Sequence, residues 1–370
     1  MRRPLAPFWL AAPSRFAALP TRPARALLAL AVFLLLGCCS ALSAPIGSTA
    51  GVSGSAADTT DVALYGEIVD GIRHGGNYYH VAAEALRAGN YPLKPFVSFR
   101  LPTLAVVEAH LPGWLVACLL GFLVTAVLIA WFGRVAAAVP RVPPRIAVAL
   151  TTAGGLIAHA QVSLAVFHEI WAGLLIALSL ALLRPGRWVE PVALGLAAML
   201  IRETAALYVV IMASFALVEG QRREAFAWIA SLGVFAVVVA LHAQAVAEVV
   251  RPLDPASPGW AGLLGFGYFV RTMIVSTALT LFPMPLAAPL VGLALIGWAG
   301  WRDAFALRVA AVLVAYAALL SVCGRADTFY WGLLVAPMVL PGLVLAPDAI
   351  RDLVSAALDK RRITVRRVVR

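Results

Sequence analysis

The chain has 370 residues, of which 62% are hydrophobic and only 13% are charged, and its mean hydropathy is +0.91. This composition excludes an ordinary soluble domain and is typical of a polytopic membrane protein. The net charge of +11 is better explained by topology than by nucleic-acid binding, because Lys and Arg gather in the short cytoplasmic loops of membrane proteins. The four cysteines lie in or beside apolar runs without metal-type spacing, which favours neither a disulfide framework nor a zinc site.

The N-terminal region combines a basic segment with an apolar run. Arginines and prolines fill residues 1–25, and residues 26–42 are apolar enough to cross a bilayer. Because basic residues favour the cytoplasmic side, we predict a cytoplasmic segment over 1–25. A single transmembrane domain over 26–346 is then expected to follow.

The longest polar stretch lies in a predicted outer loop, residues 45–112. Apolar residues at every fourth position predict a helix over 61–72, which two glycines end. Asn77 is a good helix N-cap, and a glycine follows eleven helix-favouring residues, so a second helix is expected over 78–88. Three prolines then predict an extended segment that delivers Arg100 to the start of the next span.

Apolar runs and short polar joints alternate through the rest of the chain. Together with the first run they predict an all-α membrane protein of about ten transmembrane helices, the others lying near 113–133, 146–161, 168–183, 191–202, 204–219, 225–245, 284–300, 307–323 and 331–346. We interpret residues 246–283 as an outer or re-entrant segment that carries Arg271, although a span over 260–283 is also possible. Residues 347–370 are expected to form a basic cytoplasmic tail.

The distribution of charge supports this topology. Most of the 29 Lys and Arg residues fall in the predicted inner segments, which places both termini in the cytoplasm. The six histidines and most of the acids fall in outer segments or near the outer ends of spans. Side chains capable of chemistry therefore gather on the outer face.

Three ionisable clusters lie beside the predicted spans. They are His168-Glu169, Arg202-Glu203 and the GRADTFYW run, which contains Arg325 and Tyr330. Ionisable residues at membrane depth are costly unless paired or hydrated, so these are candidates for function. Simpler explanations are a histidine that caps a helix, a tight turn with a local Arg–Glu ion pair, and interfacial anchoring by Tyr and Arg.

The outer loop offers further candidates. Asp58 and Asp61 lie at the start of its first predicted helix, and Tyr78 and Tyr79 at the start of the second. The acids also suit a solvated helix N-terminus, and the tyrosines also suit a membrane surface.

Two motifs and the overall layout resemble the glycosyltransferase C superfamily of integral-membrane enzymes, which use polyprenyl-phosphate sugars. The second motif is GRADTFYWGLLVAPMVLPGL, and the first comprises Asp61, Tyr65, Gly75, Tyr78, Tyr79, Arg87, Tyr91, Pro92, Pro95, Phe96, Arg100 and Pro102, a pattern similar to that of uncharacterised bacterial members. Members place a catalytic acid in the first outer loop, where Asp58 and Asp61 are the matching positions. The chain is short for the superfamily and shows no separate C-terminal soluble domain, so subclasses with large outer domains fit less well.

The resemblance implies a transferase of the bacterial inner membrane that moves a sugar to a lipid, glycan or other acceptor on the periplasmic face. Asp61 or Asp58 is then the general base, and Arg100, Arg202, Arg271 and Arg325 bind the donor phosphate. Substrate positioning is expected from Tyr78, Tyr79, His168, Glu169, Glu203 and Tyr330. We expect no cofactor besides the donor lipid and no metal, and membrane lipid is the expected partner rather than nucleic acid.

Two other functions fit the same composition. A transporter or lipid flippase also carries intramembrane charges, but it typically shows internal repeats and polar groups near the bilayer midplane. A non-catalytic membrane subunit could bind a lipid or partner through its outer loop. That function requires no enclosed cavity, so the placement of Asp61, Arg100, His168, Arg202 and Arg325 around one cleft distinguishes it from an enzyme.

Overall fold

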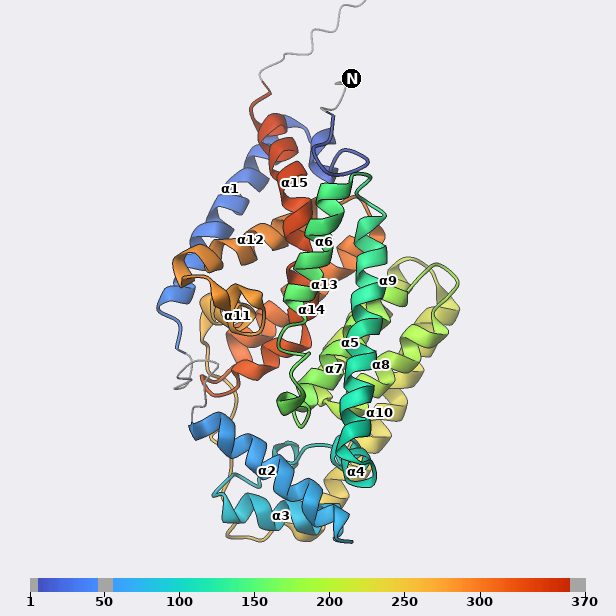
Figure 1. Ribbon diagram of the computed structural model, residues 1–370, viewed down its shortest axis with the longest axis vertical. Helices are drawn as coiled ribbons and strands as arrows, with labels where there is room; N and C mark the ends of the chain where they lie inside the picture. Colours follow the sequence, from blue (N-terminus) through green and yellow to red (C-terminus); the bar gives the residue numbers. More distant parts are fainter. Residues whose placement is uncertain (1–5, 46–55, 360–370) are drawn as a thin grey trace, which may run out of the picture.

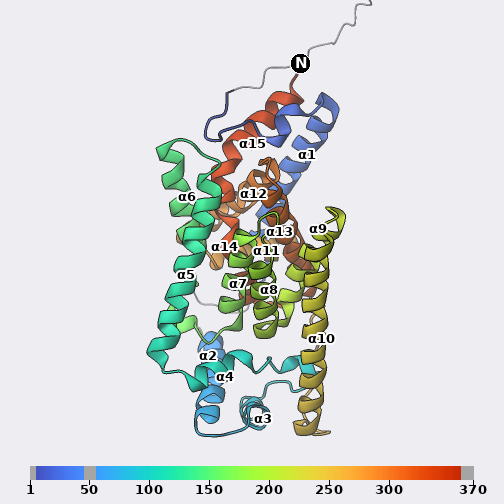
Figure 2. The ribbon, with the colours of Figure 1, turned by 90° about the vertical axis from the view of Figure 1, so that its right-hand side faces the viewer.

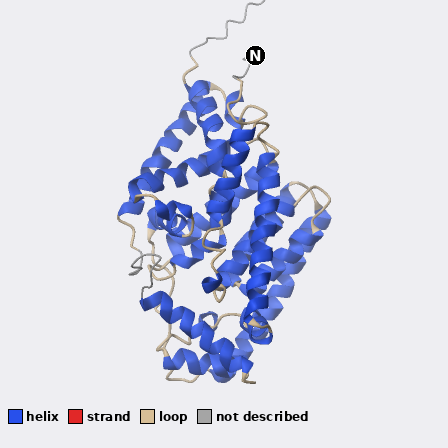
Figure 3. Cartoon of the chain, viewed as in Figure 1, coloured by secondary structure: helices blue, strands red, loops and turns tan. Residues whose placement is uncertain are grey.

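The computed structural model describes residues 6–45 and 56–359, and within these ranges the chain is helical, without a β-strand (Figure 3). The N-terminal elements are η1 (Arg15–Ala18), α1 (Thr21–Cys38) and η2 (Cys39–Leu42). The outer loop forms α2 (Ala56–Arg73), α3 (Tyr78–Ala88), η3 (Phe96–Ser98) and α4 (Thr103–His110). The central bundle contains α5 (Gly113–Ala136), α6 (Val142–Gly155), η4 (Val162–Leu164), α7 (His168–Leu182), α8 (Val189–Ile201), η5 (Glu203–Ala205), α9 (Ala206–Val218) and α10 (Arg222–Val249). The last part comprises α11 (Gly265–Val275), η6 (Ala278–Leu281), α12 (Met284–Gly300), α13 (Ala304–Cys323), η7 (Phe329–Leu334), α14 (Ala336–Val339) and α15 (Gly342–Ala357).

Four helical segments in the described ranges are long and apolar enough to cross a membrane: Thr21–Leu42, Gly113–Ala136, Arg222–Val249 and Ala304–Cys323. Shorter apolar helices, including α7, α8 and α12, pack among them. Large apolar side chains such as Phe33, Phe122 and Phe226 are each 73% exposed on the long helices. Apolar surfaces of this extent indicate a membrane protein, because lipid solvates them better than water. A total of about ten spans stays a prediction.

The expected span over 331–346 is wrong. This apolar run folds into η7, the short α14 and the start of α15, and it lies almost entirely buried. Pro337 and Pro341 lack the backbone N–H that a continuous helix requires, which explains why the run breaks up. The predicted tail also changes, because residues 347–357 belong to α15, whose Leu353 and Ala356 pack with Ile296 of α12.

The outer loop forms a separate layer, here called the cap, which consists of α2, α3, η3 and α4 (Figures 1 and 2). Its second helix matches the prediction, since Asn77 accepts a hydrogen bond from the backbone N–H of Tyr79 at 3.0 Å and Gly89 follows the last turn. Gly75 has φ +90°, a conformation that glycine adopts without strain, so α2 ends here as expected. The sequence did not predict α4. Apolar side chains from α2 and α3 form the core of the cap together with Val246 of α10.

The segment between α10 and α11, residues 250–264, runs across the cap and is called the strap below. Arg87 of α3 forms an ion pair with Asp254 at 2.7 Å, and the backbone N–H of Leu93 donates to the Pro255 carbonyl at 2.9 Å. After the strap, α11 is only eleven residues long and buries Tyr268 and Phe269 completely. The segment that carries Arg271 is therefore a short buried helix.

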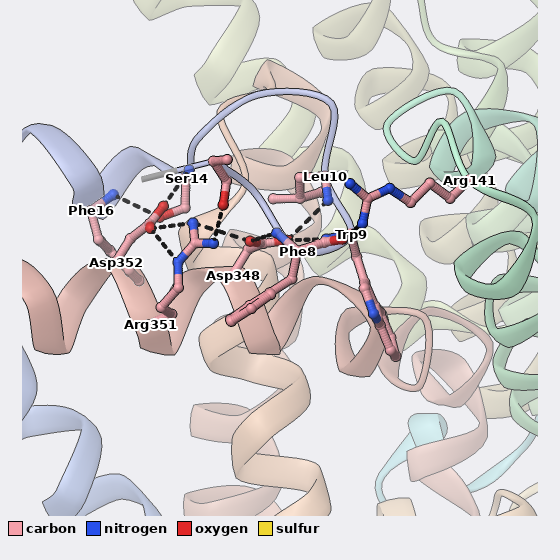
Figure 4. Close-up of polar contacts among 10 residues, drawn as sticks. Phe8, Trp9, Leu10, Ser14, Phe16, Arg141, Asp348, Arg351 and Asp352 are labelled. Atoms are coloured by element: carbon pink, nitrogen blue, oxygen red, sulfur yellow. Dashed lines mark hydrogen bonds and ion pairs between the residues drawn. The ribbon is translucent and has the colours of Figure 1, made fainter. Parts of the chain in front are cut away.

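The opposite end of the molecule holds α15 and the N-terminal arm, residues 8–14 (Figure 4). The buried carboxylate of Asp348 accepts hydrogen bonds from the backbone N–H groups of Phe8, Trp9 and Leu10 at 2.6, 2.8 and 2.9 Å. Asp352 accepts from the Ser14 backbone N–H at 2.8 Å. The N-terminal arm and the final helix thus lie together, away from the cap.

Candidate active site

A cavity of about 470 Å³ lies between the cap and the helical bundle. Its wall combines residues from α2, α3, the loop before α4, α4 itself, the start of α7, the strap and the loop before η7. The residues with chemically useful side chains are Asp61, Tyr65, Tyr78, Tyr91, Arg100, Glu108, His168, Trp260, Arg325, Asp327, Tyr330 and Trp331. Segments far apart in the chain thus contribute acids, guanidinium groups and aromatic rings to one partly open cavity.

Asp61 is the carboxylate that α2 contributes to this wall. The Tyr91 hydroxyl donates a hydrogen bond to its Oδ1 at 2.6 Å. Burial raises the pKa of Asp61 above the ordinary value, while the bond from Tyr91 and the positive charge of Arg100 act in the opposite direction. Asp61 is therefore an oriented acid whose proton affinity is increased. The side chain of Asp58 lies outside the described part of the structure.

Arg100 is a cation of the cavity wall whose guanidinium is oriented by two tyrosine hydroxyl groups. Its Nε donates to the Tyr65 hydroxyl at 3.2 Å, and its Nη2 donates to the Tyr330 hydroxyl at 3.4 Å. The Tyr78 hydroxyl donates to the backbone carbonyl of Arg100 at 2.6 Å, which fixes the main chain. The side chain is 16% exposed, its hydrogen-bond partners are neutral hydroxyl groups, and its ion pair with Glu169 is long, at 4.0 Å. The guanidinium can therefore also bind an anion in the cavity.

A buried charge network lies behind Arg100. Glu169 of α7 is 2% exposed and lies 4.0 Å from Arg100 Nη2 and 2.5 Å from Arg202 Nε. Arg202 also binds Glu203 at 2.7 Å and covers the ring of Trp331. The local Arg202–Glu203 pair predicted for this turn is present, and Glu169 links it to the cavity.

His168 and Arg325 complete the polar lining. His168 is buried with its ring edge-on to Tyr65, and the described residues provide it with no side-chain hydrogen-bond partner. Arg325 forms an ion pair with Asp327, with Nε 3.0 Å from Oδ1, and Asp327 itself also lines the cavity. An anion that binds Arg325 therefore competes with Asp327.

Five of the predicted site residues do not line the cavity. Glu169, Arg202 and Glu203 form the charge network behind its wall. Arg271 donates to the Ala44 carbonyl at 2.5 Å, because α11 packs beside η2. Tyr79 points toward α10, where its hydroxyl lies 3.2 Å from His242 Nδ1.

The cavity also contains residues that the sequence did not single out as site residues. Tyr65 is one helical turn after Asp61, a spacing that places both on the same face of α2. Glu108 is a lone acid in an apolar run, which is itself a signal. Trp260 offers no such signal, because its position depends on the path of the strap. Within the described ranges, no group of three or more His, Cys, Asp and Glu side chains is arranged to hold a metal.

Comparison of the chain with protein-family models, with curated proteins and with solved structures gives no match.

Proposed function

We propose that this chain is a membrane glycosyltransferase that moves a sugar from a polyprenyl-phosphate donor to a lipid, glycan or other acceptor. The reaction takes place beneath the cap, on the periplasmic face of a bacterial inner membrane. One observation carries the proposal: an oriented carboxylate, Asp61, and two guanidinium groups, Arg100 and Arg325, line the same cavity. A volume of about 470 Å³ lies within the range of about 300–1,000 Å³ that is usual for small-ligand sites.

The reaction requires the two kinds of group that the cavity contains. Asp61 accepts the proton of an acceptor hydroxyl or amine while the acceptor atom forms a bond to the anomeric carbon of the sugar. The bond from that carbon to the phosphate oxygen breaks, and its electron pair stays on the phosphate. Arg100 stabilises the charge that develops there, because preorganised cations act strongly where water is restricted. The raised pKa of Asp61 suits a base that must hold a proton during the step.

The other cavity residues support this chemistry. Tyr91 orients the Asp61 carboxylate, and Tyr65 and Tyr330 orient the Arg100 guanidinium. His168 has an imidazole free of side-chain partners beside Tyr65, where it can orient the acceptor or the donor. Arg202 and Glu203 act indirectly, through the position of Glu169. A single cavity that brings these groups together supports an enzyme rather than a subunit that only binds a partner.

The test is sugar transfer by purified protein in lipid discs, screened across several polyprenyl-phosphate sugars. Asp61→Asn should lower the rate by roughly 10²–10⁴-fold, the usual contribution of a general base. Asp70→Asn is the matched control on the same helix, since Asp70 is exposed and pairs only with Arg73 at the surface. Transfer by Asp61→Asn at the wild-type rate rules out Asp61 as the base. An Asp58→Asn protein tested in parallel decides between the two acids.

The donor site has its own test. Arg325→Ala should weaken use of the donor, so that a higher lipid-phosphate concentration is needed to reach half the maximal rate. An unchanged concentration dependence removes Arg325 from the phosphate site.

A further inference from the structure

The cavity wall contains a second buried acid, Glu108 of α4, which the proposed reaction does not use. Its side chain is only 6% exposed and lies between the main cavity and an apolar recess of about 90 Å³. Its Oε1 has no hydrogen-bond partner in the described part of the chain. Buried carboxyl oxygens without partners are rare, because their desolvation is costly, so this one requires an explanation.

Among residues 6–45 and 56–359, no cation binds the carboxyl group of Glu108. The nearest charge is Arg73 of α2, and its guanidinium donates instead to the backbone carbonyls of Glu108 and Ala109, at 3.0 and 3.4 Å, and to Asp70 at 2.9 Å. On the other side, the recess presents no charged side chain besides Glu108 itself, and its lining is apolar apart from Thr103 of α4, with Trp171 of α7 and Ile201 of α8 among its residues. The remaining titratable groups of the cavity wall are Asp61, Tyr65, Tyr78, Tyr91, His168, Arg100, Arg325, Asp327 and Tyr330.

Burial without a bound cation favours the neutral acid. It raises the pKa of Glu108 to about 7, with the charge of Arg73 acting weakly in the opposite direction. Asp61 differs from Glu108, because a hydroxyl donates to it and the Arg100 guanidinium faces it. Asp61 and Glu108, two of the three carboxyl groups that line this cavity, are therefore suited to different tasks, Asp61 to accepting a proton and Glu108 to donating a hydrogen bond.

We propose that Glu108 is a sugar-recognition residue, whose carboxylic acid hydrogen-bonds a hydroxyl group of the donor sugar bound in the cavity. This role rests on the function proposed above. A sugar hydroxyl both donates and accepts, which a protonated carboxyl group matches with its O–H and its carbonyl oxygen. The donor phosphate does not suit this position, because Glu108 offers it no positive charge and repels it once ionised. Arg100 and Arg325 provide the phosphate with better partners in the same cavity.

The test compares binding of two kinds of lipid to the full chain in lipid discs. The probes are polyprenyl-phosphate-linked glucose, mannose and arabinose, and polyprenyl phosphate without a sugar. At pH 6, Glu108→Ala should raise the Kd of the best-bound sugar-carrying lipid by roughly 3- to 10-fold, the effect of one hydrogen bond. The Kd of the bare lipid should stay unchanged. Glu108→Gln should restore the sugar-dependent affinity, because an amide also donates and accepts.

The pH dependence is a second readout that a merely structural role would not produce. Wild-type affinity for the sugar-carrying lipid should fall as the pH rises through about 7, whereas that of Glu108→Gln should stay flat. The matched control is Glu84→Gln, an exposed acid of α3, which should behave as the wild type. Thermal unfolding of each variant verifies that it folds.

The outcomes separate this role from the proposed function. Equal losses for the bare and the sugar-carrying lipid in Glu108→Ala, or no loss at all, overturn the role of Glu108 and leave the transferase proposal standing. If wild-type protein binds neither kind of lipid and transfers no sugar, the transferase proposal fails and the role of Glu108 fails with it.

Discussion

A substitution of Glu169 should cost substantial stability. Its carboxylate lies between two guanidinium groups, 2.5 Å from Arg202 Nε and 4.0 Å from Arg100 Nη2, and the side chain is 2% exposed. Glu169→Gln keeps the shape of the side chain and removes its charge. Arg202, itself only 3% exposed, then retains a single ionic partner, Glu203 at 2.7 Å.

The expected loss follows from the cost of a buried charge without its partner. Breaking a buried ion pair by removing one member costs about 3–5 kcal/mol. Because Glu203 still compensates part of the Arg202 charge, we expect Glu169→Gln to lower the free energy of unfolding by about 3 kcal/mol, the lower end of this range. Arg100 should contribute little to this loss, since 4.0 Å is at the limit of an ion pair and two hydroxyl groups also hold its guanidinium.

Denaturant unfolding of the purified protein in detergent measures this loss, with an exposed acid, Glu190→Gln, as the matched control. The double variant Glu169→Met, Arg202→Met should lose less stability than the two single Met variants together, because it removes both members of the buried pair. Glu203 then loses Arg202 as its partner but is 20% exposed and stays partly hydrated. A loss below about 1 kcal/mol for Glu169→Gln refutes the reasoning. A stability loss of the double variant that equals the sum of the losses of Glu169→Met and Arg202→Met, measured separately, also refutes the reasoning.

Three further predictions concern the cavity and the N-terminal arm. Tyr91→Phe removes a hydrogen bond that favours the ionised form of Asp61, so the pKa of Asp61 should rise further. The acidic limb of the plot of transfer rate against pH should then move to higher pH. A limb that does not move contradicts this. Because the pKa of Glu108 is raised in the folded protein, wild-type stability should fall as the pH rises from about 4.5 through about 7. In unfolding experiments, Glu108→Gln should therefore gain up to about 3 kcal/mol over wild type between pH 5 and pH 8. A stability difference that stays constant with pH contradicts this. Asp348→Ala leaves the backbone N–H groups of Phe8, Trp9 and Leu10 without their acceptor. Limited proteolysis should therefore cut the N-terminal arm at least several-fold faster than in wild type. Equal cleavage rates contradict this.

Local signals in the sequence predicted the parts of the fold that depend on local chemistry. The second cap helix is one such part, because the side chain of Asn77 satisfies a free N–H at its start and Gly89 follows its end. The pairing of Arg202 with Glu203 is another local feature, and the sequence offered it as the simpler alternative to a role in the site. The broken run over 331–346 was missed because its composition equals that of a span, and burial by surrounding helices replaces contact with lipid.

The candidate site was predictable in part, from ionisable residues that lie beside the ends of the predicted spans. Asp61, Arg100 and Arg325 do reach one cavity, in line with their place beside the outer ends of the predicted spans. Arg271 shares the same residue type and the same predicted face, but the packing of α11 against η2 points it toward Ala44. No short-range pattern encodes that packing. Glu108 and Trp260 are in the cavity for the same reason, because tertiary contacts place α4 and the strap.

The hydrogen bonds between the N-terminal arm and α15 join the first and last described parts of the chain, which are synthesised at different times. The backbone groups of Phe8 and Ser14 are synthesised 340 and 338 residues before the carboxylates of Asp348 and Asp352 that hold them. During translation, the arm must therefore wait at the membrane surface, hydrated and open to proteases, while the intervening helices insert. These hydrogen bonds therefore form late in assembly. In a nascent chain that is stalled before α15, the N-terminal arm should still be accessible to proteases.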